Sequence, residues 1–227
     1  MSRITVLFDL DGVLLDSRST TLAALAGIAT AALGRRVTVD DLPVEAITTE
    51  RDEILAALGV PRPGELLGAC WDIAVATAPG PCLFPGILEG LVALKDAGVA
   101  TGLVTLQSRT RLPWLLPPAV LELLNVTVCW EDAEPKPAPD GILLALERLD
   151  GTVRRTLFVG DTLTDQAAAR SAGVGFAGAG WGFAGPHVLA AGGTATVLSS
   201  PAEIGTGLLD LIDSAGMTEQ SVSADSL

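Results

Sequence analysis

The sequence has few basic residues, few cysteines and no long apolar run, and each shortage excludes a class of protein. Its 227 residues include 14 lysines and arginines against 27 aspartates and glutamates, which gives a formal net charge of −13. Nucleic acids and anionic membranes bind basic surfaces, so neither is expected as a partner. Gly, Pro, Asp or Arg interrupts the apolar stretches well before the roughly 20 residues that a membrane span needs, which predicts a soluble protein.

The cysteines and the first residues predict where the protein resides. Cys70, Cys82 and Cys129 are odd in number, widely spaced and form no C-x-x-C pair, so reduced thiols are expected. Residues 1–9 lead directly into an apolar strand, without the long apolar core and small-residue cleavage site of a secretory signal. Both features predict a cytoplasmic protein.

Short apolar segments alternate with helical patterns over most of the chain. The expected strands are Ile4–Phe8, Ala100–Thr105, Val126–Cys129, Thr156–Val159 and Thr196–Leu198. The expected helices are Gly86–Ala97, Pro137–Leu149, Thr164–Ala172 and Ala202–Ile212. This alternation predicts an α/β fold with a doubly wound, mostly parallel sheet covered on both faces. Such a sheet binds ligands beyond the carboxyl ends of its strands.

The interval from Ser17 to about Phe84 breaks this alternation, because it contains helical patterns and no convincing strand. We therefore predict a helical insertion directly after the first strand. The expected helices of the insertion are Ser19–Leu33, Thr49–Leu58 and Gly64–Ala76. The predicted division is a core of residues 1–16 and 85–213, an insertion of residues 17–84, and a polar, disordered tail of residues 214–227.

Two carboxylates, Asp9 and Asp11, follow the first expected strand within Phe8-Asp9-Leu10-Asp11-Gly12. They can point into one pocket only if something offsets their repulsion, usually a divalent cation. A calcium-binding EF-hand loop does not fit, because the required glycine and closing glutamate are missing. A helix-capping role would explain one aspartate but not both.

Asp161 follows a second apolar strand, and Asp165 lies four residues later at a helix start. Alone, this pair would be a turn and a helix cap. Because the strand ends of a doubly wound sheet converge on one edge, Asp161 and Asp9 together favour a site for a hard cation with oxygen ligands.

Lys136 and Thr105 are two further candidate site residues. Lys136 is one of two lysines and lies between prolines, which reduce the freedom of the segment, although most lysines are merely solvated. Thr105 ends an expected strand, where a hydroxyl and free backbone amides can bind a phosphoryl oxygen.

Taken in their order along the chain, these four segments resemble the motif set of the haloacid dehalogenase superfamily. The helical insertion resembles the C1 cap of that superfamily. The resemblance extends from Ile4 to about Leu211 and is closest to the phosphoglycolate-phosphatase-like branch. The segments that carry it are Phe8-Asp9-Leu10-Asp11-Gly12, Lys136-Pro137-Ala138-Pro139, Val159-Gly160-Asp161-Thr162 with Asp165, and Gly180-Trp181-Gly182. One departure is that Leu106-Gln107-Ser108 follows Thr105, where many relatives have asparagine directly after the hydroxyl residue.

The resemblance implies a Mg²⁺-dependent phosphatase that hydrolyses a small-molecule phosphate ester as a monomer or homodimer. It makes Asp9 the nucleophile that becomes an aspartyl phosphate, and Asp11 the general acid and base. It implies three metal ligands, which are the side chains of Asp9 and Asp161 and the backbone carbonyl of Asp11. Asp165 would support the metal through its waters. Lys136 and Thr105 would hold the phosphoryl group.

Several alternatives differ in the residues that they need. Asp11 argues against dehalogenation, and the absence of lysine from residues 17–84 argues against phosphonoacetaldehyde hydrolysis. A β-phosphoglucomutase-like mutase stays open, although the single histidine, His187, lies far from the first motif. A binding protein without catalytic activity is the remaining alternative. The substrate itself is undetermined, and the residues considered for its recognition are Arg51, Arg62, Arg109, Arg111, Trp71 and Trp181.

Overall fold

The computed structural model describes residues 3–214, which divide into two compact units. One unit consists of residues 3–14 and 83–214, and the other is Leu15–Cys82. The helical unit therefore begins and ends two residues before the predicted insertion of residues 17–84. The predicted tail, residues 214–227, lies outside the described residues except for Ser214.

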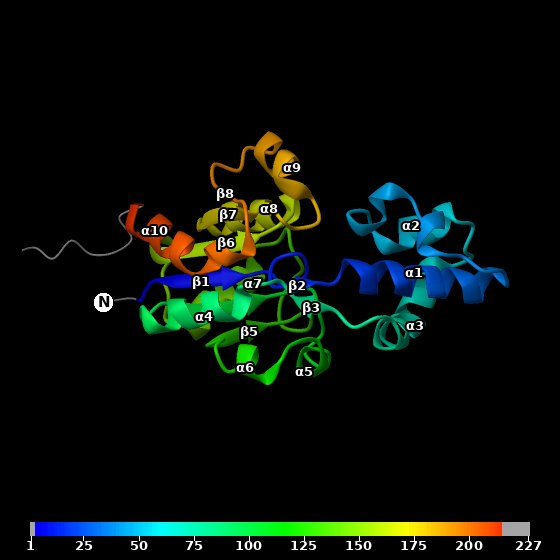
Figure 1. Cartoon of the computed structure of the whole chain (residues 1–227), viewed down its shortest axis with the longest axis horizontal. Helices are drawn as coiled ribbons and strands as arrows, with labels where there is room; N and C mark the ends of the chain where they lie inside the picture. Colours follow the sequence, from blue (N-terminus) through cyan, green and yellow to red (C-terminus); the bar gives the residue numbers. More distant parts are fainter. Residues whose placement is uncertain (1–2, 215–227) are drawn as a thin grey trace, which may run out of the picture. The chain divides into compact units, whose positions relative to one another are not determined.

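The larger unit is built on a six-stranded sheet in the order β5-β4-β1-β6-β7-β8, and every neighbouring pair is parallel (Figure 1). The strands are β1 (Thr5–Phe8), β4 (Ala100–Val104), β5 (Val126–Val128), β6 (Thr156–Gly160), β7 (Gly175–Ala179) and β8 (Val197–Leu198). The predicted doubly wound parallel sheet is confirmed. Since β4 and β6 flank β1, three strand ends meet around the carboxyl end of β1.

Helices cover the two faces of this sheet (Figure 1). On one face, α7 (Asp140–Arg148) and α8 (Leu163–Ala172) pack their apolar sides against β1, β4, β5 and β6 in one continuous core. On the other lie α4 (Ile87–Asp96) and α10 (Thr206–Ser214). Burial on both faces explains why these strands are almost uniformly apolar.

The larger unit also contains elements that the sequence pattern did not predict. Strand β7 has the sequence Gly-Phe-Ala-Gly-Ala, without a β-branched residue, and it forms because it pairs with β6 and β8 on either side. The helix expected at Ala202–Ile212 is wrong in its extent, because Gly205 separates a short 3₁₀ helix from α10. The other unpredicted elements are α5 (Leu112–Leu115), α6 (Pro118–Leu121), α9 (Gly185–Ala191) and the 3₁₀ helices η3 (Val153–Arg155) and η4 (Pro201–Ile204).

The helical unit has its own apolar core. Its elements are α1 (Arg18–Leu33), η1 (Val39–Asp41), η2 (Val44–Ile47), α2 (Arg51–Ala57) and α3 (Pro63–Thr77). Leu25, Leu55 and Trp71 are buried in this core. The interval from Ser17 to Phe84 contains one strand, β3 (Cys82–Leu83), which pairs with β2 (Leu15–Asp16) just before the interval. Two-residue strands are too short to leave a recognisable sequence pattern.

Two further observations concern the predicted location of the protein. Within residues 3–214, no helix has the length and apolar character needed to cross a membrane. The three cysteines, Cys70, Cys82 and Cys129, are all unpaired. The cytoplasmic location itself stays a prediction.

Candidate active site

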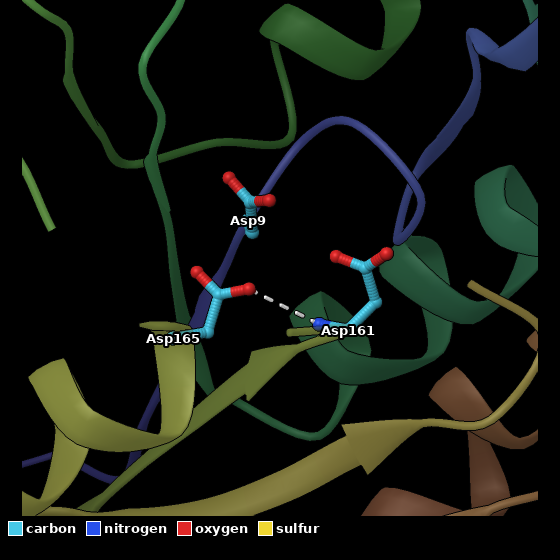
Figure 2. Close-up of side chains that lie close together, drawn as sticks. All are labelled: Asp9, Asp161 and Asp165. Atoms are coloured by element: carbon cyan, nitrogen blue, oxygen red, sulfur yellow. Dashed lines mark hydrogen bonds between the residues drawn. The ribbon is translucent and has the colours of Figure 1, made fainter. Parts of the chain in front are cut away.

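The parallel sheet brings two of the predicted carboxylates together at its carboxyl edge. Asp9 directly follows β1 and Asp161 directly follows β6, and the backbone N–H of Asp9 donates to the carbonyl of Val159 at 2.9 Å. Asp165 joins them from the first turn of α8. Figure 2 shows the three side chains gathered at this edge, and one carboxylate oxygen of each lies within 4.8 Å of the others.

Asp165 is held by four donors. Its Oδ1 accepts a hydrogen bond from Nζ of Lys136 at 2.6 Å. Its Oδ2 accepts from the hydroxyl of Thr162 at 2.6 Å, and from the backbone N–H groups of Thr162 and Asp161 at 3.1 and 3.3 Å. Asp165 therefore closes a capping box at the start of α8 and also orients Lys136.

Lys136 lies between two carboxylates. Its Nζ is 2.7 Å from Oδ1 of Asp9 and 2.6 Å from Oδ1 of Asp165, and its side chain is only 6% exposed. Burial lowers the pKa of Lys136, but the charges of Asp165 and Asp9 outweigh this effect and raise the pKa above its ordinary value. The buried ammonium group is therefore positively charged at neutral pH.

The two carboxylate oxygens of Asp161 differ in their contacts. Its Oδ2 accepts from the backbone N–H of Phe183 at 2.7 Å. Its Oδ1 is buried and has no hydrogen-bond partner among the described residues. Gly12 has a φ of +82°, and a Cβ there would lie 2.2 Å from Oδ2 of Asp161; a Cβ at Gly182 would lie 2.2 Å from Cβ of Asp161. Only glycine at these two positions lets the backbone approach this carboxylate so closely.

The cluster carries an excess of negative charge, because three carboxylates surround one ammonium group. Burial raises the pKa of Asp9 to about 7 against the opposing effect of Lys136. Burial, together with the charges of Asp165 and Asp9, also raises the pKa of Asp161 well above its ordinary value. A divalent cation would offset this repulsion, and Oδ1 of Asp161 is a ligand atom without a partner among the described residues, so the residues present fit a hard metal ion.

Asp11 and Thr105 are connected through a residue that the sequence reasoning did not assign. Nε2 of Gln107 donates to Oδ2 of Asp11 at 2.8 Å, and the backbone N–H of Gln107 donates to Oγ1 of Thr105 at 3.1 Å. Thr105 is buried and lines one small cavity with Lys136. The only sequence signal for Gln107 was the departure from the superfamily pattern after Thr105.

The aromatic residues considered for substrate recognition have structural partners. Trp71 is buried in the core of the helical unit, with the guanidinium of Arg51 at 4.3 Å from its ring centroid. Trp181 donates from Nε1 to the carbonyl of Val13 at 3.1 Å and meets Phe84 edge-on. Packing and hydrogen bonding account for the placement of both rings.

The remaining arginine candidates also have partners within their own unit. Arg62 forms an exposed ion pair with Glu65 at 2.9 Å. Arg109 pairs with Asp132, and Arg111 donates to Gln107. These contacts give each arginine a local role in the structure.

Known proteins are similar to this chain in sequence and in fold. The haloacid dehalogenase-like hydrolase family model matches residues 6–179. The "Probable phosphatase IndB" of Dickeya dadantii is 32% identical over 192 residues, covering 78% of this chain and 81% of that protein. The phosphoglycolate phosphatase of Salmonella paratyphi A is 30% identical over 240 residues, covering 93% of this chain and 92% of that protein. CbbY from Rhodobacter sphaeroides, whose crystal structure is in complex with phosphate, is 27% identical in sequence. The two structures have a TM-score of 0.71, and the match covers 92% of this chain and 99% of CbbY.

The matched region includes every residue that the motifs singled out for chemistry, from Asp9 to Asp165. The superfamily resemblance predicted from those motifs is confirmed. The chain belongs to the haloacid dehalogenase-like hydrolase family and is a phosphatase of its phosphoglycolate-phosphatase-like branch.

Proposed function

We propose that this protein is a Mg²⁺-dependent phosphatase that hydrolyses a small-molecule phosphate monoester through an aspartyl phosphate on Asp9. The observation that carries the proposal is the cluster at the sheet edge, where Asp9 contacts Lys136 and a carboxylate oxygen of Asp161 lies within 4.8 Å of one of Asp9. Oδ1 of Asp161 has no hydrogen-bond partner among the described residues. Phosphoryl transfer depends mainly on alignment and on neutralising the charge of the phosphoryl oxygens. An ordered nucleophile beside an ammonium group and a cation site meets both needs.

In the first step, a carboxylate oxygen of Asp9 attacks the phosphorus atom. The bond between phosphorus and the ester oxygen breaks, and Asp11 gives its proton to the leaving oxygen. In the second step, Asp11 takes a proton from water as the water oxygen attacks the phosphorus. The bond from phosphorus to Asp9 then breaks, which releases inorganic phosphate and regenerates the carboxylate.

Lys136 and Thr105 would stabilise the phosphoryl group during both steps. Lys136 places its ammonium group 2.7 Å from Asp9, where it offsets the negative charge of nucleophile and phosphoryl oxygens. The hydroxyl oxygen of Thr105 already accepts a hydrogen bond from Gln107, so the hydroxyl proton is directed to another acceptor. A phosphoryl oxygen in the cavity that Thr105 shares with Lys136 is that acceptor.

Asp9, Asp161 and the backbone carbonyl of Asp11 are the groups that would hold Mg²⁺. The ion supplies positive charge that favours the ionised form of Asp9 and neutralises the phosphoryl oxygens. Asp165 has both oxygens occupied by Lys136, Thr162 and the backbone. Asp165 would therefore support the site without binding the ion directly.

Substrate choice would depend on the helical unit, which we propose to be the C1 cap of this branch. Phosphatases similar to this chain include one named for phosphoglycolate, and a CbbY structure holds phosphate. A panel of metabolite phosphates ranked by kcat/KM would identify the substrate. Phosphate release with Mg²⁺ that disappears in Asp9→Asn is the expected result, and an inactive wild-type protein over the whole panel would refute the proposal.

A phosphosugar mutase is the alternative chemistry on this fold. Those relatives have a histidine soon after the first motif, whereas His187, the single histidine of this chain, is exposed on α9. No observation on the described residues favours the mutase. Incubation with a hexose 1-phosphate separates the two, because a mutase would produce hexose 6-phosphate and a phosphatase would release inorganic phosphate.

A further inference from the structure

Gln107 is a buried side chain whose amide group has a partner at both ends. Its Nε2 donates to Oδ2 of Asp11 at 2.8 Å, and its Oε1 accepts from Nη1 of Arg111 at 3.0 Å. Only 9% of the residue is exposed. The amide group of Gln107 therefore links Arg111 to Asp11.

The orientation of this amide follows from the chemistry of its two partners. A guanidinium group can only donate hydrogen bonds, so the group of the amide that contacts Arg111 must be the acceptor. The carbonyl oxygen of Gln107 must therefore face Arg111, and its NH₂ group must face Asp11.

The backbone of Gln107 is fixed as well. Its N–H donates to Oγ1 of Thr105 at 3.1 Å, and its carbonyl accepts from the N–H of Trp130 at 3.1 Å. A side chain that starts from a fixed backbone and is held at its tip has little freedom to move. Gln107 is thus a rigid donor aimed at one oxygen of Asp11.

We propose that Gln107 is a positioning residue, which holds the carboxyl group of Asp11 in the orientation for proton transfer to the leaving oxygen. The proposal rests on the proposed function, because it requires Asp11 to be the general acid. A hydrogen bond to Oδ2 fixes the plane of the carboxyl group and hence the direction of the transferred proton. Small errors in such an orientation slow a reaction strongly.

The proposal predicts a dependence on the leaving group. When the phosphoryl group is transferred to Asp9, an alkyl ester oxygen needs the proton of Asp11 in order to leave. In contrast, p-nitrophenolate is a stable anion and leaves without a proton. General acid catalysis contributes on the order of 10² to 10⁴-fold to a rate. Loss of Gln107 should therefore slow the hydrolysis of alkyl phosphates much more than that of p-nitrophenyl phosphate.

The test is Gln107→Met, which keeps the length of the side chain but removes both hydrogen bonds. We expect kcat/KM, which reports the steps up to formation of the aspartyl phosphate, to fall about 10 to 100-fold for alkyl phosphates and about threefold or less for p-nitrophenyl phosphate. Ser108→Ala, a change in the same loop, is the matched control and should leave both substrates unaffected. An equal loss for both substrates would overturn the proposal, since a general disturbance of the loop would cause it.

Two further variants keep the proposal testable if Gln107→Met folds poorly. Arg111→Met removes the hydrogen bond to Oε1 of Gln107 but keeps the one from Gln107 to Asp11, so it should show a smaller loss with the same dependence on the leaving group. Adding Gln107→Met to Asp11→Asn should cause no further loss for alkyl phosphates, because the group that Gln107 positions is already gone. A further loss of tenfold or more in that double variant contradicts the proposal.

The outcomes also separate this proposal from the proposed function. An active wild-type enzyme with an equal loss in Gln107→Met refutes the role of Gln107 alone. A wild-type protein that hydrolyses neither substrate with Mg²⁺ refutes the phosphatase mechanism, and the role of Gln107 with it.

Discussion

The edge of the sheet and the core of the helical unit bury side chains of opposite kinds. Asp9, Asp161 and Asp165 are 8%, 0% and 1% exposed and share one ammonium group, whereas the helical unit buries mainly Ala, Leu, Ile and Val. Burial of apolar surface stabilises a fold by about 25 cal/mol per Å². Burial of carboxylates with raised pKa values opposes folding.

The two regions therefore differ in what they contribute. The helical core contributes stability, and its composition is explained by packing alone. The acidic cluster is costly to bury, and the proposed metal ion and reaction would account for its presence. Substitutions in the two regions should consequently separate activity from stability.

The largest expected effect is on the activity of Asp9→Asn. Without the nucleophilic oxygen, phosphatase activity should fall about 10³-fold or more. The Tm of the metal-free variant at pH 8 should be equal to or above that of the wild type, because a buried carboxylate with a raised pKa is removed. Activity assays and thermal melting check the two parts. Asp96→Asn, an equivalent change on the exposed surface of α4, is the control and should alter neither.

Leu55→Ala should have the opposite pattern. Leu55 is fully buried in the helical unit, and truncation of a buried leucine lowers the free energy of unfolding by about 2 to 5 kcal/mol. Urea denaturation followed by circular dichroism measures the change. The exposed neighbour Glu53→Ala should change it by less than about 0.5 kcal/mol. A loss below about 1 kcal/mol for Leu55→Ala would show that this core is not tightly packed.

Mg²⁺ should stabilise the protein more at pH 8 than at pH 5.5. Protons compete with the cation for Asp9, whose pKa of about 7 leaves it largely protonated at the lower pH. At a concentration 100 times Kd, the ion should add about 2.7 kcal/mol to the free energy of unfolding. Thermal melting with and without Mg²⁺ measures this, and Asp161→Asn should lose most of the increment. Equal stabilisation at both pH values would place the ion elsewhere.

The metal-free protein should lose stability as the pH rises from about 4 to 7. The carboxyl group of Asp9 has a pKa of about 7 in the folded chain and an ordinary value of 3.8. Between these values the folded state holds a proton that the unfolded state has released, so deprotonation favours unfolding. Asp9→Asn should weaken this dependence and leave the part due to Asp161, whereas Asp96→Asn should preserve it.

The smallest effects are expected for the arginines of the helical unit. Arg51→Ala removes a cation–π contact with Trp71 and should lower the free energy of unfolding by about 0.5 to 1 kcal/mol. Arg62→Ala breaks an exposed ion pair and should change it by less than about 0.5 kcal/mol. Chemical denaturation distinguishes these values. A large increase in KM for either variant would instead assign that arginine to substrate binding.

The sequence predicted much of the sheet and of the acidic site because both depend on local patterns. A short apolar run that ends in a carboxylate identifies β1 with Asp9 and β6 with Asp161. The local pattern did not predict β7, because its Gly and Ala residues have little strand propensity of their own. Pairing with two neighbouring strands overrides such weak local preferences.

The amino-acid sequence by itself determined the kinds of group available, namely strand-end carboxylates, one proline-flanked lysine and a hydroxyl, and hence the chemical class of the site. Only the tertiary structure decided which groups meet. Gln107 contacts Asp11 across 96 positions of the chain, and Phe183 contacts Asp161 across 22. No local pattern specifies contacts at such separations, because they arise when parallel strands place distant loops at one edge of the sheet.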